Sequence, residues 1–455
     1  MNRWLLSLGS IAVVVGLTVA GSLVAPAALP LTEVPTVATR STLVCPGFAS
    51  ATATRTVIAA STQSDLRLAK LSAPQNPKTG TGLVRLSDSE EPVRVSAERT
   101  GAFGATTTVT AADGSDRGLS MARCLLPQPE YWFTGVLVGT NSGSEVDLVN
   151  LDGTRAVVDL TAYGPSGKLA ATRGVVVDPG AEKKVSLALI QRGDQPITVR
   201  VTSSEGRIAA FLRQRSWGAT RPLGADWLPA SAAPATDLVV PGVPDGAGRR
   251  TLVLGNPGDR TAVVKVDVLS ASGPTNVVGA VNVEVLAGTT KAVELSAGLG
   301  GGAAGVHLSS DQPITAGLLA DSGGSENEID PASAAAADAL PDDGIWPLAL
   351  AKSATAVVTF TNPESAAVTA TVTLGSGGTG QDSTVKIPAQ STVTFAVPKS
   401  SASSIRIRTQ ATTLRAAVVV RQTVGKVKGL AVVVLMAGQG RTEPIQVGYD
   451  PHLGS

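Results

Sequence analysis

The feature that most constrains this chain of 455 residues is an internal repeat with a period of 106 residues. Asn150, Asn256 and Asn362 lie at this spacing, and each ends a strand-like run (VDLVN, TLVLGN or VTFTN) that is followed by a short turn. A propeller blade needs only ~40–50 residues, whereas a unit of ~100 residues can bury a core of its own. The spacing therefore predicts three tandem modules of one fold.

The run after each turn alternates between apolar and polar residues. In the second copy, positions 262, 264, 266 and 268 are apolar, while Lys265 and Asp267 lie between them. The other two copies keep the same phase at the same offset. Alternation with one polar face is typical of a half-buried antiparallel strand. A slip of one residue would bury a charge, so the register is well specified.

Each unit contains about seven short strands in ~100 residues, with turn signals between them, which is the size of an immunoglobulin-like sandwich. We expect an all-β chain of tandem immunoglobulin-like β-sandwich modules, with three clear repeats and one divergent module, preceded by a single N-terminal hydrophobic helix. The modules should be joined by modest interfaces, and residues 228–237 and 330–343 resemble linkers. The expected boundaries are 1–28 for a membrane anchor or signal peptide, 29–128 for the divergent module closed by a disulfide, 131–235, 237–342 and 344–447 for the sandwiches, of which the last is basic, and 448–455 for a tail.

The N-terminus indicates export. Residues 4–25 are uncharged and mostly apolar, and ~20 such residues can span a bilayer as a helix. Arg3 favours an orientation with the N-terminus in the cytoplasm. The length of the run favours an uncleaved single-pass anchor in the cell membrane, with the rest of the chain extracytoplasmic. The alternative is a signal peptide cut near Ala27 and a secreted protein.

The chain has two cysteines, Cys45 and Cys124. In an exported protein, two cysteines are most simply interpreted as one disulfide. Two buried thiols are the alternative, and we expect no metal site at this pair.

The composition removes most catalytic chemistry. The chain contains two histidines and 3% aromatic residues. It lacks a phosphate-binding loop and the GxSxG, HExxH and EF-hand patterns. His307 lies in an alternating run and is expected on a strand surface. We therefore expect no cofactor and no catalytic residues; a hydrolase with carboxylates far apart in sequence is the enzymatic alternative. The 37 basic and 36 acidic residues nearly cancel, which argues against a nucleic-acid partner.

Two segments are strongly charged. Residues 321–343 carry seven acidic and no basic residues, which suggests either a calcium site or, as we favour, a solvated loop and linker. The last module instead carries a basic stripe that could bind an anionic polymer, although an ordinary charged sheet face would look the same. Its members are Arg406, Arg408, Arg415, Arg421, Lys426 and Lys428.

Tryptophan and arginine residues gather around the second module. They suggest either a surface that stacks a ligand or, as we favour, a stacked joint between modules. These residues are Trp132, Arg213, Arg215, Trp217 and Trp227.

Several short motifs resemble those of an actinobacterial family of exported proteins, the family of domain of unknown function 5719. The motifs are LVCPG at 43–47, EYWFTG at 130–135, YGPSG at 163–167, DWLP at 226–229 and VVPGV at 239–243. The resemblance implies an envelope or secreted protein with no assigned activity, and it supplies no catalytic residues.

From these patterns we expect a non-catalytic, extracytoplasmic scaffold or interaction protein of the cell envelope. Its partners would be envelope proteins or a cell-wall polymer, together with the membrane through the N-terminal helix. The alternative is a binding module for an anionic cell-wall polymer or glycan.

Overall fold

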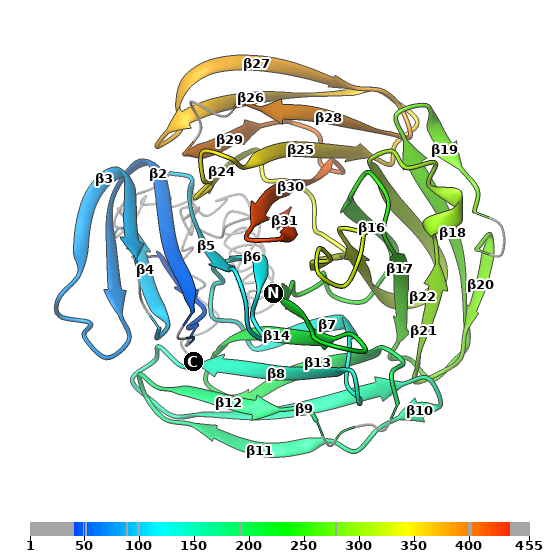
Figure 1. Cartoon of the computed structure of the whole chain (residues 1–455), viewed down its shortest axis with the longest axis horizontal. Coiled ribbons are helices and arrows are strands. Elements are labelled where there is room, and N and C mark those ends of the chain that lie inside the picture. The colour runs from blue at the N-terminus through cyan, green and yellow to red at the C-terminus, as the bar shows by residue number, and fades with distance from the viewer. Residues whose placement is uncertain are drawn as a thin grey trace, which may run out of the picture. The chain divides into compact units, whose positions relative to one another are not determined.

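A computed structural model describes residues 41–436, except 49, 51, 88–89, 98–100, 189, 191–192, 278–279 and 399–402. Its secondary structure is almost entirely strand, and the prediction of an all-β protein is confirmed (Figure 1). The one helix of this part is a short 3-10 turn, Ser296–Gly298. No helix among the described residues is long and apolar enough to cross a bilayer. The predicted N-terminal helix and the tail at 448–455 lie outside the described residues.

The first module is a single sheet in the order β1-β4-β2-β5-β6, with β3 paired to β2. A register shift in β2 between Ala60 and Asp65 lets its two halves pair with different neighbours. Its edge strands come together where Val44 and Leu125 exchange backbone hydrogen bonds of 2.7 and 2.8 Å. The strands are β1 (Ser41–Cys45), β2 (Ala53–Lys70), β3 (Lys78–Ser87), β4 (Val93–Ala97), β5 (Phe103–Ala111) and β6 (Gly118–Arg123).

The second module has two sheets. We call the sheet β12-β8-β14-β15 its inner sheet and the sheet of β10, β9, β13, β7 and β11 its outer sheet. The strands are β7 (Glu130–Val136), β8 (Ser142–Val149), β9 (Ala156–Gly164), β10 (Gly167–Lys168), β11 (Thr172–Val177), β12 (Glu182–Ser186), β13 (Ile197–Glu205), β14 (Ala209–Trp217) and β15 (Pro222–Leu228).

The third module repeats this arrangement, with β21-β17-β22-β23 as the inner sheet. Its outer sheet contains β16, β18, β19, β20 and the first half of β22, so the long β22 belongs to both sheets. The strands are β16 (Ala235–Val243), β17 (Arg250–Asn256), β18 (Ala262–Ser270), β19 (Gly273–Thr275), β20 (Asn282–Val285), β21 (Thr289–Glu294), β22 (Ala304–Asp321) and β23 (Pro331–Ala335).

The fourth module has the inner sheet β28-β25-β30-β31 and the outer sheet β24-β29-β26-β27. The strands are β24 (Asp343–Pro347), β25 (Thr355–Asn362), β26 (Val368–Ser376), β27 (Thr379–Ile387), β28 (Ser391–Val397), β29 (Ser404–Arg408), β30 (Arg415–Val424) and β31 (Val427–Leu435).

The strands predicted to follow each repeated asparagine are β9, β18 and β26. In β18 the apolar positions 262, 264, 266 and 268 are buried, whereas Lys265 is exposed. The alternation therefore marked the core face correctly.

The three repeated asparagines are fully buried and make the same hydrogen bonds. The Asn256 amide donates to the carbonyls of Arg260 (2.7 Å) and Val285 (3.0 Å), and its Oδ1 accepts the N–H of Gly258 (3.0 Å). Asn150 and Asn362 bind the equivalent groups of their own modules. Two donors and one acceptor on one short side chain explain why asparagine stands at this position.

Replacement of Asn256 by alanine is expected to lower the free energy of unfolding by about 2–3 kcal/mol, because it deprives buried backbone groups of their partners. Urea denaturation would measure the loss. Asn256→Asp should be nearly as harmful, since it removes both donors, and Asn141→Ala at an exposed position is the control. Equal midpoints for Asn256→Ala and the control would contradict this role.

The modules share their cores, in contrast to the expected modest interfaces. An apolar cluster crosses each junction: first to second module through Phe48 and Trp227, and second to third through Phe133 and Leu319. Val432 joins the core of the third module, and β6 contributes to that of the fourth. The described residues accordingly fall within one compact unit. The reason lies in strands such as β31, whose continuous apolar run is buried on both faces.

The last strand of each module takes part in a closed circuit of contacts. Strand β6 contacts β31 and β15, and β23 contacts β15 and β31. Strand β23 (PASAA) consists largely of small residues, and β6 (GLSMAR) contains three of them, which allows close approach. Residues 330–343 are therefore not a linker: they include β23, where Ala332 and Ala334 are buried. The Ala-rich composition that suggested a linker instead reflects close packing.

Candidate functional site

The buried carboxylate of Asp330 lies where the circuit of strands closes. Its Oδ2 accepts the N–H groups of Leu119 in the first module (2.9 Å) and Leu430 in the fourth (2.8 Å). Gly118 has φ +108°, and a Cβ at this position would overlap Asp330 Oδ1. One side chain of the third module thus binds the backbones of two others. This corrects the interpretation of 321–343 as wholly a solvated loop and linker.

Asp226, on β15 of the second module, is a second buried carboxylate at this centre. It hydrogen-bonds to Ser333 of the third module and to the N–H of Trp227. Burial raises the pKa of Asp226 and of Asp330, and the charge of Asp226 adds a smaller upward shift to the pKa of Asp330. Both groups thus contact donors inside the core, although Asp226 Oδ2 and Asp330 Oδ1 have no hydrogen-bond partner among the described residues.

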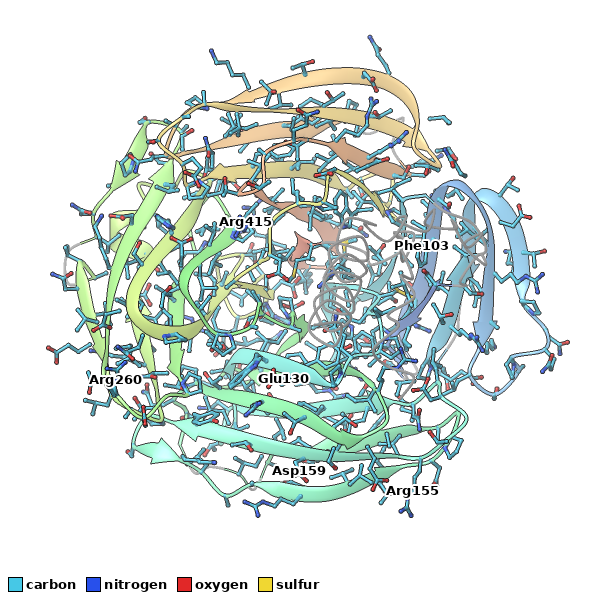
Figure 2. All side chains as sticks on the ribbon, turned by 180° about the vertical axis from the view of Figure 1, so that it is seen from behind. Phe103, Glu130, Arg155, Asp159, Arg260 and Arg415 are labelled. Atoms are coloured by element: carbon cyan, nitrogen blue, oxygen red, sulfur yellow. A yellow bond between two sulfur atoms is a disulfide. The ribbon has the colours of Figure 1, made fainter. Side chains whose placement is uncertain are left out.

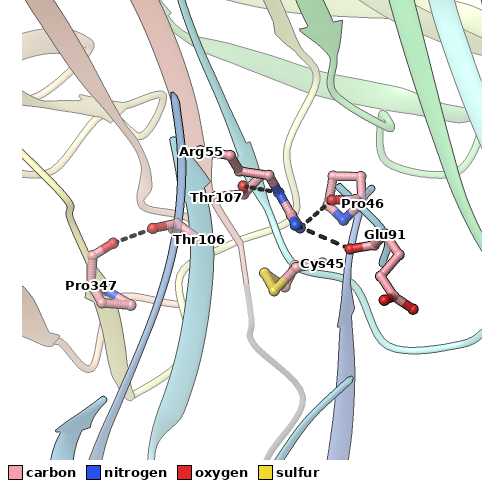
Figure 3. Close-up of a disulfide and its surroundings, with 8 residues drawn as sticks. Cys45, Pro46, Arg55, Glu91, Thr106, Thr107 and Pro347 are labelled. Atoms are coloured by element: carbon pink, nitrogen blue, oxygen red, sulfur yellow. Dashed lines mark hydrogen bonds between the residues drawn. A yellow bond between two sulfur atoms is a disulfide. The ribbon is translucent and has the colours of Figure 1, made fainter. Parts of the chain in front are cut away.

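The predicted disulfide between Cys45 and Cys124 is confirmed (S–S 1.97 Å). It joins the end of β1 to the residue after β6, so it closes the two edges of the first module. Arg55 lies beside it and donates to Thr107 Oγ1 (3.1 Å) and to the carbonyls of Glu91 (3.1 Å) and Pro46 (Figure 3). Burial lowers the pKa of Arg55 to about 10.

Three of the five tryptophan and arginine residues singled out in the sequence lie between the first two modules. The Arg213 guanidinium stacks 3.8 Å from the Phe48 ring centre and pairs with Asp116 (2.5 Å). Arg215 also reaches Asp116 (2.8 Å). Trp227 packs edge-on against Phe48, at 6.4 Å between ring centres. These contacts make a stacked joint.

The other two tryptophans lie elsewhere. Trp132 of β7 stacks on Tyr163 (6.1 Å) and under Arg200 (5.2 Å). Trp217, at the end of β14, is 36% exposed. The five residues therefore do not form one surface.

The buried side chain of Asp147, on β8, makes the stability of the protein depend on pH. Burial raises its pKa from 3.8 to about 7, and Lys184 opposes the shift. Because the folded pKa is the higher one, the contribution of Asp147 to stability is greatest below about pH 4, falls as the pH rises and levels off above about 7. We expect Asp147→Asn to match wild type near pH 4 and to melt at a higher temperature than wild type at pH 8. Melting curves from pH 4 to 8 test this, and a constant offset between the two proteins would contradict it.

The six basic residues of the fourth module are divided between two sheets. Arg406 and Arg408 belong to outer strand β29, and the others to β30, β31 and their turn. Arg415, labelled in Figure 2, donates to the Ala337 carbonyl (3.0 Å), and Lys426 is exposed in the turn. The remaining four pair with acids from other segments: Arg406 with Asp343 (2.6 Å), Arg408 with Asp382 (2.5 Å), Arg421 with Asp245 (2.6 Å) and Lys428 with Glu328 (3.2 Å).

A cavity of about 320 Å³ is the best candidate for a site that takes a small molecule. It lies between the end of the first module and the starts and ends of the others. Its walls include Leu43, Leu126, Pro129, Tyr131, Ala232 and Met436, with Arg123, Gln128, Glu130 and Asp338 as polar members. Burial lowers the pKa of Arg123 to about 10.

Comparison with protein families identifies the chain's relatives. The sequence profile of a family of unknown function, DUF5719, matches residues 85–398. The chain belongs to the DUF5719 family. The DUF5719 match includes strands of all four modules. It leaves out Cys45, strands β29, β30 and β31, and Met436 of the cavity wall.

Other comparisons add no activity to the DUF5719 assignment. Among curated proteins, none matches the chain. A crystal structure of Streptomyces avermitilis α-L-rhamnosidase complexed with L-rhamnose aligns at 10% identity with a TM-score of 0.13. The alignment covers 83% of this chain and 56% of that one, so the chain spans little more than half of that enzyme's length. At this TM-score the likeness carries no argument.

Sequence reasoning missed the cavity, Asp330 and Asp147. Asp330 precedes an Ala-rich run flanked by prolines, and an apolar run with one acidic residue beside it could have indicated a buried strand with a fixed carboxylate. Arg123 carries no local signal, because its setting depends on residues far away in sequence.

Proposed function

We propose that this DUF5719 protein is a non-catalytic, extracytoplasmic scaffold or interaction protein of the cell envelope. The observation that carries the proposal is the closed circuit of the four end strands, because it fixes the modules against one another. A fixed array presents its outer surfaces at constant spacing, as a platform for partners requires. Tandem modules without such contacts would move about their linkers instead.

Polar bonds at every junction support a fixed array. Apolar contact alone would allow modules to slide, whereas hydrogen bonds and ion pairs specify one arrangement. The bonds are Arg213 to Asp116 between the first and second modules (2.5 Å), Thr134 to Thr315 between the second and third (2.6 Å), Arg421 to Asp245 between the third and fourth (2.6 Å) and Thr106 to the Pro347 carbonyl between the fourth and first (2.7 Å).

The setting of the carboxylates favours this proposal over a hydrolase. The acids whose pKa values burial raises most are Asp147, Asp226 and Asp330. A general acid must reach its substrate, and none of these three lines the 320 Å³ cavity. Asp226 and Asp330 contact backbone groups and neighbouring modules instead.

The extracytoplasmic location is proposed from two sequence features. The apolar run at residues 4–25 is long enough to anchor or export the chain. The disulfide fits an oxidising compartment.

Pairing of the basic residues makes the polymer-binding alternative weaker. Arg408 lies in the wall of an open hollow of about 610 Å³, but Asp342 and Asp343 share that wall. An anionic polymer there would meet carboxylates as well as cations.

Cosedimentation of the full chain with purified cell-wall and membrane fractions, at low and high salt, separates the two functions. A scaffold should bind wall polymer weakly and without strong salt dependence, and photo-crosslinkers at exposed Trp217 or Val263 should capture discrete envelope proteins in cells. Salt-sensitive polymer binding that is lost in a variant with Arg408, Lys426 and Lys428 changed to Gln would overturn the scaffold proposal. The matched control changes the exposed Lys168, Arg173 and Lys183 of the second module.

A further inference from the structure

The 320 Å³ cavity is lined by apolar residues and by one arginine that makes few hydrogen bonds within the protein. Its volume lies at the lower end of the range for small-molecule sites, which are mostly apolar with a few placed polar groups. Leucine, proline, alanine and methionine make up eight of its sixteen lining residues. Arg123, on the last position of β6, is the basic residue of this lining.

Arg123, which is partly exposed, differs from the buried Arg250 in its hydrogen bonds. Arg250 donates to the carbonyls of Pro244, Arg249, Asp245 and Asp321 at 2.8–3.1 Å. Within the described part of the chain, by contrast, the hydrogen bond of the Arg123 guanidinium is to the thioether sulfur of Met436 (3.2 Å). A thioether is a weak acceptor, and a guanidinium has five N–H donors. Arg123 is partly exposed, so its remaining N–H groups are open to water or to a ligand in the cavity.

The other polar groups of the lining leave the Arg123 guanidinium available to bind an anion. Glu130 pairs with Arg200, which lies outside the lining. The Tyr131 hydroxyl donates to the Leu126 carbonyl (2.5 Å). Asp338 is exposed to solvent, and its charge raises the pKa of Arg123 while burial lowers it. Arg123 therefore carries its charge at neutral pH, with one solvated carboxylate nearby.

We propose that this cavity binds a small amphiphilic molecule that has one carboxylate or phosphate group and a short apolar body. The anionic group accepts hydrogen bonds from the Arg123 guanidinium, which holds carboxylates and phosphates in a two-point geometry. The apolar body contacts Leu43, Leu126 and Met436. Such a site would give the scaffold a ligand at the point where its modules meet.

Calorimetric titration of the full chain with octanoate, octyl phosphate and neutral octan-1-ol tests the proposal. We expect saturable binding of at least one anion at a stoichiometry of one, and at least tenfold weaker binding of octan-1-ol. Preference between the two anions decides whether the site suits a carboxylate or a phosphate. Arg123→Gln should weaken the anion about 10- to 100-fold, as expected for a lost charged hydrogen bond, and leave octan-1-ol unchanged. Arg123→Lys should retain part of the affinity.

Two further variants separate ligand binding from folding. Asp338→Asn removes the competing negative charge and should tighten anion binding several-fold, an effect that a purely structural role of Arg123 does not produce. Arg155→Gln is the control, since Arg155 lies in the second module away from Glu130 and the cavity (Figure 2). Equal affinities for the anions and octan-1-ol, no binding of either anion, or an unchanged affinity in Arg123→Gln would each overturn the proposal.

Discussion

Replacement of Asp330 by alanine is expected to lower the free energy of unfolding by about 4 kcal/mol. The change leaves the N–H groups of Leu119 and Leu430 without their acceptor in the interior, and each unpaired buried N–H costs about 1–3 kcal/mol. The loss should not be local, because these two groups belong to the first and fourth modules while Asp330 belongs to the third.

Asp330→Asn is the matched control. An amide keeps one oxygen that can accept both N–H groups, and it carries no charge, as does the carboxyl whose pKa burial raises. We expect Asp330→Asn to lie within about 1 kcal/mol of wild type at neutral pH.

Urea denaturation and hydrogen exchange would test this pair of variants. The amides of Leu119 and Leu430 should exchange faster in Asp330→Ala and stay protected in Asp330→Asn. If the two variants lose equal stability, the charge of Asp330 matters rather than its acceptor oxygen. If neither loses stability, the circuit of strands does not depend on this residue.

The elements of the fold could be predicted from local patterns, since those patterns reflect local physics. The asparagine repeat and the alternation around Lys265 both follow from burial within one module. The pairing of Cys45 with Cys124 followed from their number and the signs of export. None of these inferences needs knowledge of how the modules pack.

Packing between modules could not be predicted in this way. The segment PASAA, next to Asp330, has the composition of a linker, and its burial depends on β15 and β31, about 100 residues away on either side. Counting charges in the fourth module could not show how these cations pair, for the same reason. Arg421 and Lys428 have no acidic neighbours in sequence, but Asp245 and Glu328 reach them from the third module.

The disulfide carries the other large expected effect. It closes a loop between residues 79 positions apart, and the chain-entropy relation gives an upper value of about 4.5 kcal/mol for a loop of this length. The double variant Cys45→Ala/Cys124→Ala should therefore lose up to about 4.5 kcal/mol. Removing both cysteines avoids a lone reactive thiol. Oxidised protein that is denatured without reductant should contain no free thiol.

Refolding and unfolding rates would show whether the disulfide acts on the unfolded or on the folded state. If it stabilises mainly by restricting the unfolded chain, its removal should slow refolding more than it speeds unfolding. The denaturant dependence should also steepen, because an open chain exposes more surface. If unfolding accelerates instead, the bond acts in the folded state. It would then hold β1 against β6, and the Leu119 amide bound to Asp330 would lose protection along with the first module's edge. Stopped-flow measurements on the oxidised protein and the double variant distinguish these outcomes, and unchanged rates in both directions would show that the Val44–Leu125 pairing closes the module without the disulfide.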